Sequence, residues 1–179
     1  MKRMITIGLG ILAISASAFA QEGLDKALAA APRQMKEGAT VIKWNADYTY
    51  ETLRKGTNRL VCFDRTGQPG QQPFSVECTS IANLDRVAQN LKFEAISDKA
   101  ARDAAMAAAE ANGTRVKPEF GSVWLHMSGP DQEHARTHTT VAVPGATAQS
   151  LGLPDNPRQG GIWIMNAGTT TAHLMTPGS

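Results

Sequence analysis

The sequence predicts an α+β domain with a mainly antiparallel sheet, two or three helices packed on one face of that sheet, and one disulfide. Strand-like segments come first along the chain, two helix-forming segments follow, and further strand-like segments come last. Elements that are segregated in this way usually give an antiparallel sheet with helices on one side. The chain also has two cysteines, and its 179 residues suffice for one hydrophobic core.

Residues 1–20 have the pattern of a secretory signal peptide. Two basic residues precede an apolar run from Met4 to Ala16, and Ala18-Phe19-Ala20 is the small-x-small motif after which signal peptidase cuts. A membrane anchor is the alternative, but the run is shorter than the roughly 20 residues that span a bilayer. We therefore expect residues 21–179 to form a single exported domain, periplasmic or extracellular, with no stable membrane anchor after cleavage.

The expected exported domain is formally neutral. The whole chain has 18 Lys and Arg residues against 16 Asp and Glu residues, and removal of Lys2 and Arg3 leaves 16 of each sign. Proteins that bind nucleic acid or anionic membrane surfaces need a surplus of positive charge to neutralise phosphate groups. We therefore expect no nucleic-acid partner.

The first strand-like segments are residues 39–44, 48–54, 59–65 and 74–78, separated by turn-forming residues. The turn after residue 54 predicts a hairpin between the second and third segments. Cys62 and Cys78 lie in the last two segments, on either side of a loop rich in Gly, Pro and Gln. We expect them to form a disulfide, since an oxidising compartment preserves such bonds. Two free thiols and a redox-active pair are the alternatives, and no C-x-x-C spacing supports the latter.

Two helices are predicted next. Apolar residues recur at helical spacing from Ile81 to Leu91, and Ser80 is available as the N-cap. An alanine-rich helix follows from Asp98 to Asn112, before Gly113. The polar residues of the first helix that we expect to face away from the core are Asp85, Arg86, Gln89 and Asn90.

Beyond Pro118, strands are predicted at residues 121–127, 138–143, 161–165 and 170–176. Side chains alternate between the two faces of a sheet. Val123, Leu125 and Met127 therefore share one face, which we expect to pack on the helices. If these strands are neighbours in matching register, the opposite face presents Trp124, His126, Trp163, Met165, His173 and Met175.

The histidines suggest two candidate metal sites, because imidazole and thioether groups suit copper and imidazole also binds zinc. The first consists of His126, His173 and Met175. The second consists of His134 and His138, which share one side if their segment makes a helical turn. The sequence has no H-E-x-x-H or C-x-x-C-H motif. Surface histidines, or histidines hydrogen-bonded within the core, are the alternative interpretation.

Three classes of function remain open. The first is a binding or structural module of the cell envelope, which requires the fewest special residues. Its candidate binding face, for a small apolar ligand or an envelope protein, is formed by Trp124, Trp163 and Met165. A protein that binds copper or zinc through histidine and methionine is the first alternative. A small secreted hydrolase with a histidine base, and with Ser122, Ser128 or one of the threonines at residues 169–171 as nucleophile, is the second. The chain lacks G-x-S-x-G, so we predict no specific catalytic set.

Overall fold

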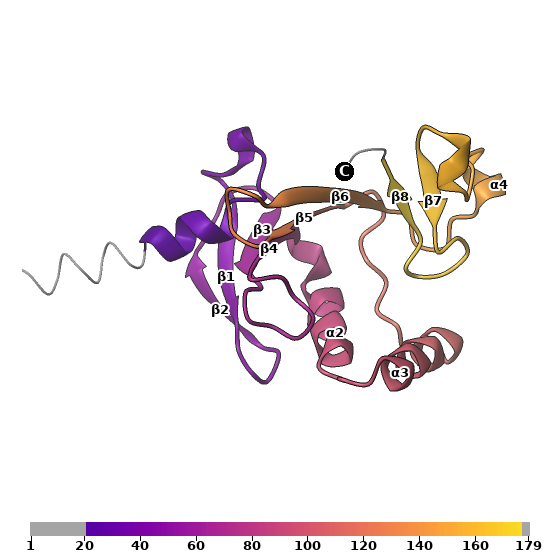
Figure 1. Ribbon diagram of the computed structural model, residues 1–179, viewed down its shortest axis with the longest axis horizontal. Coiled ribbons are helices and arrows are strands. Elements are labelled where there is room, and N and C mark those ends of the chain that lie inside the picture. Colours follow the sequence, from indigo (N-terminus) through magenta and orange to yellow (C-terminus); the bar gives the residue numbers. More distant parts are fainter. Residues whose placement is uncertain (1–20, 177–179) are drawn as a thin grey trace, which may run out of the picture.

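The computed structural model describes residues 21–176, whose strands form one eight-stranded sheet (Figure 1). The strand order is β2-β1-β3-β4-β5-β6-β8-β7. The strands are β1 (Thr40–Trp44), β2 (Tyr50–Arg54), β3 (Leu60–Asp64), β4 (Phe74–Ser80), β5 (Val123–Gly129), β6 (Arg136–Ala142), β7 (Trp163–Met165) and β8 (His173–Met175). The predicted α+β class is confirmed.

The sheet is mixed, because β1 and β3 are parallel while the other neighbouring strands described are antiparallel. The hairpin predicted between residues 48–54 and 59–65 is wrong, since β1 lies between β2 and β3. Thr40, Val41 and Ile42 are successive buried residues of β1. A strand buried on both faces is typical of a sheet interior, where it has a neighbour on each side.

The predicted disulfide joins Cys62 of β3 to Cys78 of β4. The two residues are direct cross-strand partners, and both are fully buried. They are 16 residues apart in the sequence. Closing a loop of this length stabilises a fold by about 3 kcal/mol in the chain-entropy model. The bond holds β3 and β4 in one register beneath the loop that connects them.

Both predicted helices are present. α2 (Leu84–Glu94) follows a 3-10 turn, η2 (Ile81–Asn83), and the Ser80 hydroxyl accepts a hydrogen bond from the Ala82 N–H. α3 (Lys99–Ala111) comes next. The other short helices are η1 (Arg33–Met35), α4 (Ala148–Leu151) and η3 (Pro157–Gln159).

The buried side of α2 differs from the prediction at Arg86. We expected this residue to face away from the core, but it is 3% exposed and lies beside Val87 on the buried side. Ile81, which we placed on the apolar stripe, is 44% exposed. The buried stripe starts instead at Leu84, and Arg86 lies at its edge, where its long side chain reaches acceptors inside the protein.

Two hydrophobic clusters cover opposite faces of the sheet. On one face, Val76 and Leu125 pack with Ala27 of the N-terminal segment, whose residues 21–27 are helical. On the other face, Phe63 packs with Val87 of α2. Figure 1 shows the indigo N-terminal helix and α2 on opposite sides of β1 to β4. We expected helices on one face of the sheet only. α2 lies on one face, with α3 packed against it, but the helical residues 21–27 lie on the other face.

The C-terminal part of the sheet has a smaller core of its own. Val143, Ala146, Ile164 and Ala172 pack together there. Figure 1 shows β7, β8 and α4 at the end of the molecule remote from the N-terminal helix. This core supports short strands that the main clusters do not reach.

The predicted signal peptide, residues 1–20, lies outside the described residues. Within residues 21–176, the helices are too short or too polar to cross a bilayer. The disulfide is present, and bonds of this kind persist in oxidising compartments.

Gly56 allows the β2–β3 connection to pass close to the start of β1. A Cβ atom here would lie 2.2 Å from the Gly38 oxygen and 2.5 Å from the Thr40 nitrogen, both backbone atoms. We predict that Gly56→Ala lowers the free energy of unfolding by about 1–3 kcal/mol, the usual cost of overpacking. Urea denaturation measures this change. Gly23→Ala is the control, because a Cβ there meets no atom within 4 Å; equal stability of the two variants would contradict the prediction.

Candidate functional site

The strand pairings place the predicted aromatic, histidine and methionine cluster on one face of the sheet. Cross-strand partners form rows that run across the strands. The rows are Trp124–Thr140–Met175–Trp163, Ala142–His173–Met165 and Glu77–His126–His138. All six predicted face residues therefore point to the same side, in three different rows.

His126 and His173 lie in rows that are not adjacent. His126 is opposite His138, whereas His173 is opposite Ala142, four residues further along β6. At about 3.3 Å per residue, these rows are roughly 13 Å apart. The row of Trp124 lies between them. The two histidines consequently belong to different parts of the face.

α2 covers the part of this face that carries Trp124, which we expected to be the open side. Trp124 packs against the cluster that contains Leu84 and Val87 of α2. Leu125 and Met127 instead face the N-terminal segment. The expectation that only the aliphatic face packs on helices is therefore wrong, because the indole ring is itself a large apolar surface that needs cover.

His126 lies in a half-buried polar environment. Its Nε2 is 2.9 Å from the Ser75 hydroxyl, which is also 2.8 Å from Gln71 Oε1. Burial lowers the pKa of His126 below its ordinary value of 6.5, and the positive charge of Arg65 and the neighbouring His138 act in the same direction. His126 is therefore mainly neutral at pH 7.

His134 and His138 do not share a helical turn, so this expectation is wrong. His138 lies in β6 beside His126, while His134 precedes the strand and is exposed. The Nδ1 atom of His134 lies 2.8 Å from Asp131 Oδ1. Residues 136–142 are extended because they pair with β5 along the strand.

The structure groups few metal-ligating side chains. In residues 21–176, no three His, Cys, Asp or Glu side chains lie together in a way that could hold a metal ion. The Nδ1 atom of His173 is 2.7 Å from the Thr171 carbonyl oxygen. Binding of copper or zinc stays a prediction from the sequence.

The candidate nucleophile Ser122 has structural hydrogen bonds. The Ser122 hydroxyl donates to the Glu119 carbonyl oxygen and accepts from the Asn83 amide. The serine that meets a histidine is Ser75, which has no exposed surface. A nucleophile must be reached by its substrate. The geometry therefore gives no support to the hydrolase hypothesis.

An ion network joins β3, β4 and α2 on the same face as His126. Arg65 Nη1 is 2.9 Å from Glu77 Oε2, and Arg65 Nη2 pairs with Glu94 at the end of α2. The Arg65 and Glu77 side chains are each 7% exposed. Burial raises the pKa of Glu77, and the attraction of Arg65 opposes that rise. The network attaches the C-terminal end of α2 to the sheet.

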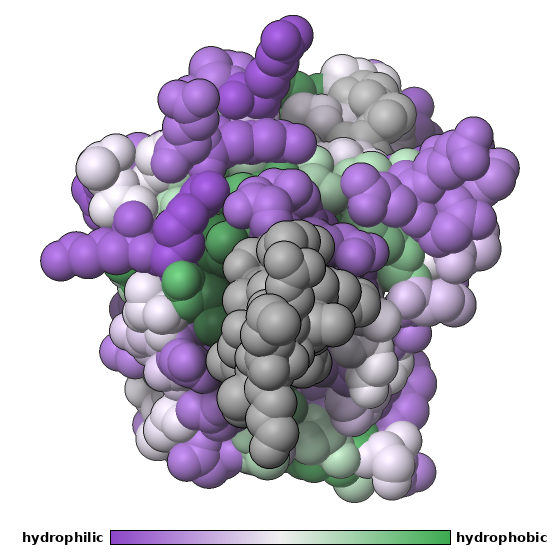
Figure 2. Space-filling view, turned by 90° about the vertical axis from the view of Figure 1, so that its left-hand side faces the viewer, coloured by the Kyte–Doolittle hydropathy of each residue, from purple (hydrophilic) through white to green (hydrophobic). Residues whose placement is uncertain are grey.

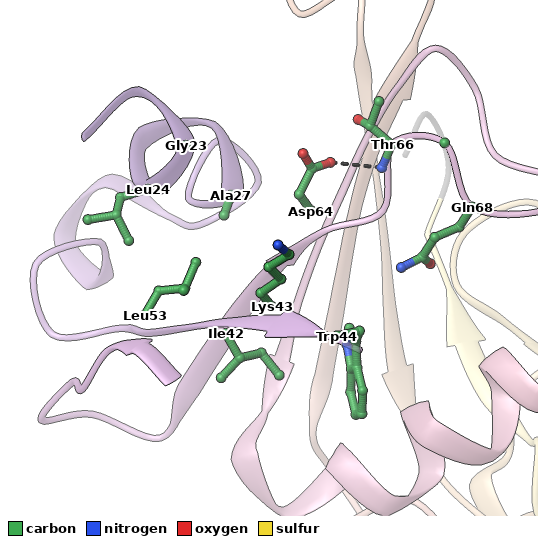
Figure 3. Close-up of a pocket in the computed structure, with 11 residues that line it drawn as sticks. Gly23, Leu24, Ala27, Ile42, Lys43, Trp44, Leu53, Asp64, Thr66 and Gln68 are labelled. Atoms are coloured by element: carbon green, nitrogen blue, oxygen red, sulfur yellow. Dashed lines mark hydrogen bonds between the residues drawn. The ribbon is translucent and has the colours of Figure 1, made fainter. Parts of the chain in front are cut away.

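A cavity of about 670 Å³ lies between residues 21–27 and the β1–β2 edge of the sheet. Leu24, Ala27 and Leu53 give it apolar walls, and the loop after β3 supplies Thr66 and Gln68 (Figure 3). Figure 2 shows this side of the molecule, where hydrophobic side chains are recessed among hydrophilic ones. The cavity is thus apolar along one wall and polar at one end.

Basic and acidic side chains lie at the polar end of this cavity. Lys26 Nζ is 2.7 Å from Asp64 Oδ2 and 2.8 Å from Thr66 Oγ1. Burial opposes the ionisation of Asp64, but hydrogen bonds from Lys26 and from the Thr66 N–H lower its pKa below the usual value. Lys43 extends toward Asp64 from β1 (Figure 3), and no ion pair within residues 21–176 includes it. Lys26 is paired with Asp64, so Lys43 is the cation here that can meet an acidic ligand, and its cross-strand neighbour is Glu51.

The sequence analysis missed Lys43 and Glu77, and it did not predict that Arg65 is buried. Lys43 did carry a signal, because it shares a strand face with buried Val41 and is a basic residue on an otherwise apolar side. Arg65 and Glu77 lie at strand positions where charged residues usually face solvent. Their burial depends on α2, which covers them from elsewhere in the sequence.

The chain matches no protein-family model, no curated protein and no solved structure. The cavity and the charged groups are therefore the features that bear on function. The chemistry of a site determines function more directly than the fold does.

Arg65 and Glu77 give a test of the ion network. We predict that Arg65→Met lowers the free energy of unfolding by about 3–5 kcal/mol, because it leaves Glu77 buried without its partner. The double variant Arg65→Met/Glu77→Leu should recover part of this loss. Urea denaturation measures both variants. A single variant as stable as the double variant would show that the pair does not act as a unit.

His126 gives a test by pH. Its pKa is lower in the folded than in the unfolded chain, so protonation favours unfolding. The stability it confers is complete above the unfolded value of about 6.5 and is lost as the pH falls below it. We predict that His126→Gln loses less stability than the wild type between about pH 7.5 and 5.5, measured by thermal unfolding. Identical curves for His126→Gln and the wild type would contradict this role.

Proposed function

We propose that the protein is an exported binding module and that its ligand is a small, largely apolar molecule with an acidic group. The observation that carries this proposal is the cavity of about 670 Å³ with apolar walls and Lys43 at its polar end. Pockets for small molecules usually have volumes of about 300–1,000 Å³, with apolar linings and a few polar groups that orient the ligand. The cavity has both properties.

Export is supported by the signal-like pattern of residues 1–20 and by the buried disulfide. Disulfides persist in the periplasm and outside the cell. An exported domain of neutral charge meets its ligand in a compartment where small amphipathic molecules diffuse freely. We propose that the protein binds its ligand in that compartment.

The expected binding mode follows from the lining. The apolar part of the ligand lies against Leu24, Ala27 and Leu53, where each buried CH₂ group contributes about 0.8 kcal/mol. Its acidic group lies near Lys43. The Lys26–Asp64 pair fixes the neighbouring loop, because Lys26 also contacts Thr66.

Calorimetric titration with laurate and with dodecanol tests this function. We predict that the protein binds both molecules and that laurate binds up to about fivefold more tightly, since an exposed ion pair contributes up to about 1 kcal/mol. In Lys43→Gln this preference should disappear while dodecanol binding stays unchanged. The difference in affinity between laurate and dodecanol measures the contribution of the acidic group alone.

Leu53→Arg tests the apolar wall, because it puts a charged group where the alkyl chain should lie. We predict that it weakens binding of the neutral dodecanol at least tenfold, because dodecanol has no negative charge with which the new arginine could pair. Its control is Ile162→Arg, because Ile162 is similarly exposed, at 45% against 47% for Leu53, but does not line the cavity. Failure of the wild type to bind either molecule, or equal binding by the two arginine variants, would contradict the proposed function.

A further inference from the structure

Arg86 is a buried arginine whose hydrogen-bond acceptors are all uncharged. It is 3% exposed. Its Nη1 donates to the Val116 carbonyl oxygen and to Thr170 Oγ1, and its Nη2 donates to Thr171 Oγ1. No ion pair found within residues 21–176 includes Arg86. Burying a charge is costly unless a group of opposite charge compensates it.

Arg86 lies near two other charged groups, Arg115 and Glu110. Arg115 is a second buried guanidinium, and it donates to two side-chain amides of α2. The acidic group is Glu110, whose two oxygens already accept hydrogen bonds from Thr170. Burial lowers the pKa of Arg86 to about 10, the charge of Arg115 adds to this effect, and Glu110 opposes it. Glu94 also acts on Arg115, but it pairs with Arg65, so Arg86 itself has no ion-pair partner among residues 21–176.

A small cavity lies beside Arg86. Its volume is about 130 Å³, and its lining includes Arg86 and Asn90 from α2 and Trp124, Thr140 and His173 from the sheet. The Asn90 oxygen accepts a hydrogen bond from Arg115, so its amide N–H groups remain as donors. The cavity thus combines a cation, amide and hydroxyl donors, and an aromatic wall. None of these five residues lines the cavity beside Lys43.

We propose that this second cavity binds a compact carboxylate, with the carboxylate group on Arg86 and the apolar part of the ligand against Trp124. A guanidinium has five N–H donors. Three are used by Val116, Thr170 and Thr171, which leaves two. A carboxylate has two acceptor oxygens and a full negative charge, so it matches both the remaining donors and the positive charge of Arg86.

The volume limits the ligand to about the size of one ring. A cavity of roughly 150 Å³ with an apolar lining holds benzene, and the cavity beside Arg86 has about 130 Å³. Trp124 gives a planar surface against which an aromatic ring packs well. Benzoate has the right charge, size and shape, whereas laurate is too long. This second site does not depend on the function proposed for the larger cavity.

Calorimetric titration of the protein with benzoate tests the proposal. Benzoate should bind, and benzyl alcohol, a neutral molecule of similar size, should bind at least tenfold more weakly. Inorganic phosphate should also bind more weakly than benzoate, because it has no apolar part to contact Trp124. Arg86→Met should weaken benzoate binding at least tenfold. The exposed Arg33→Met, which is outside the cavity, should bind benzoate as the wild type does.

A second variant keeps the test decisive if Arg86→Met fails to fold. Thr140→Leu fills the cavity without altering the hydrogen bonds of Arg86, so it should also lose benzoate binding, with circular dichroism confirming that it folds. Lys43→Gln should keep benzoate binding, which separates this site from the larger cavity. The proposal is overturned if the wild type does not bind benzoate, or if folded Thr140→Leu binds it as tightly as the wild type.

Discussion

The pairing of β3 with β4, closed by the Cys62–Cys78 bond, fixes the register on which both faces of the sheet depend. A shift of one residue in a strand turns every side chain to the opposite face. In the observed register, Val76 faces the N-terminal helix while Glu77 faces α2. The same register continues through β5 to β8 and sets the rows that contain the histidines.

α2 separates two polar regions on its face of the sheet. Near its end, Glu94 meets the Arg65–Glu77 pair, where acidic and basic groups are matched. Near its start, the hydrogen bonds of Arg86 found within residues 21–176 go to uncharged acceptors only. Apolar residues such as Val87 pack between these regions. The first region, whose charges are paired, therefore stabilises the fold, and we propose the second, where Arg86 has no ion-pair partner among residues 21–176, as a binding site.

Local sequence signals predicted much of the fold, but they did not predict contacts made across the sheet. Alternation and turn residues located the strands, and helical spacing with Ser80 as a cap located α2. The parallel pairing of β1 with β3 was missed, because strands adjacent in sequence form hairpins more simply. Arg86 was assigned to the solvent side, because helical spacing shows where a residue lies on the helix but not what covers that position. Neither cavity could be predicted, since each is lined by segments that are distant in the sequence.

The central claim is that the cavity between the N-terminal helix and the β1–β2 edge is a ligand site. Backbone amide chemical shifts, recorded by NMR during a titration with laurate, test it most directly because they locate the contact. The account predicts that the largest changes occur at Leu24, Lys43, Leu53 and Thr66, which line the cavity. Changes confined to other parts of the sheet, or no changes at saturating laurate, would contradict it.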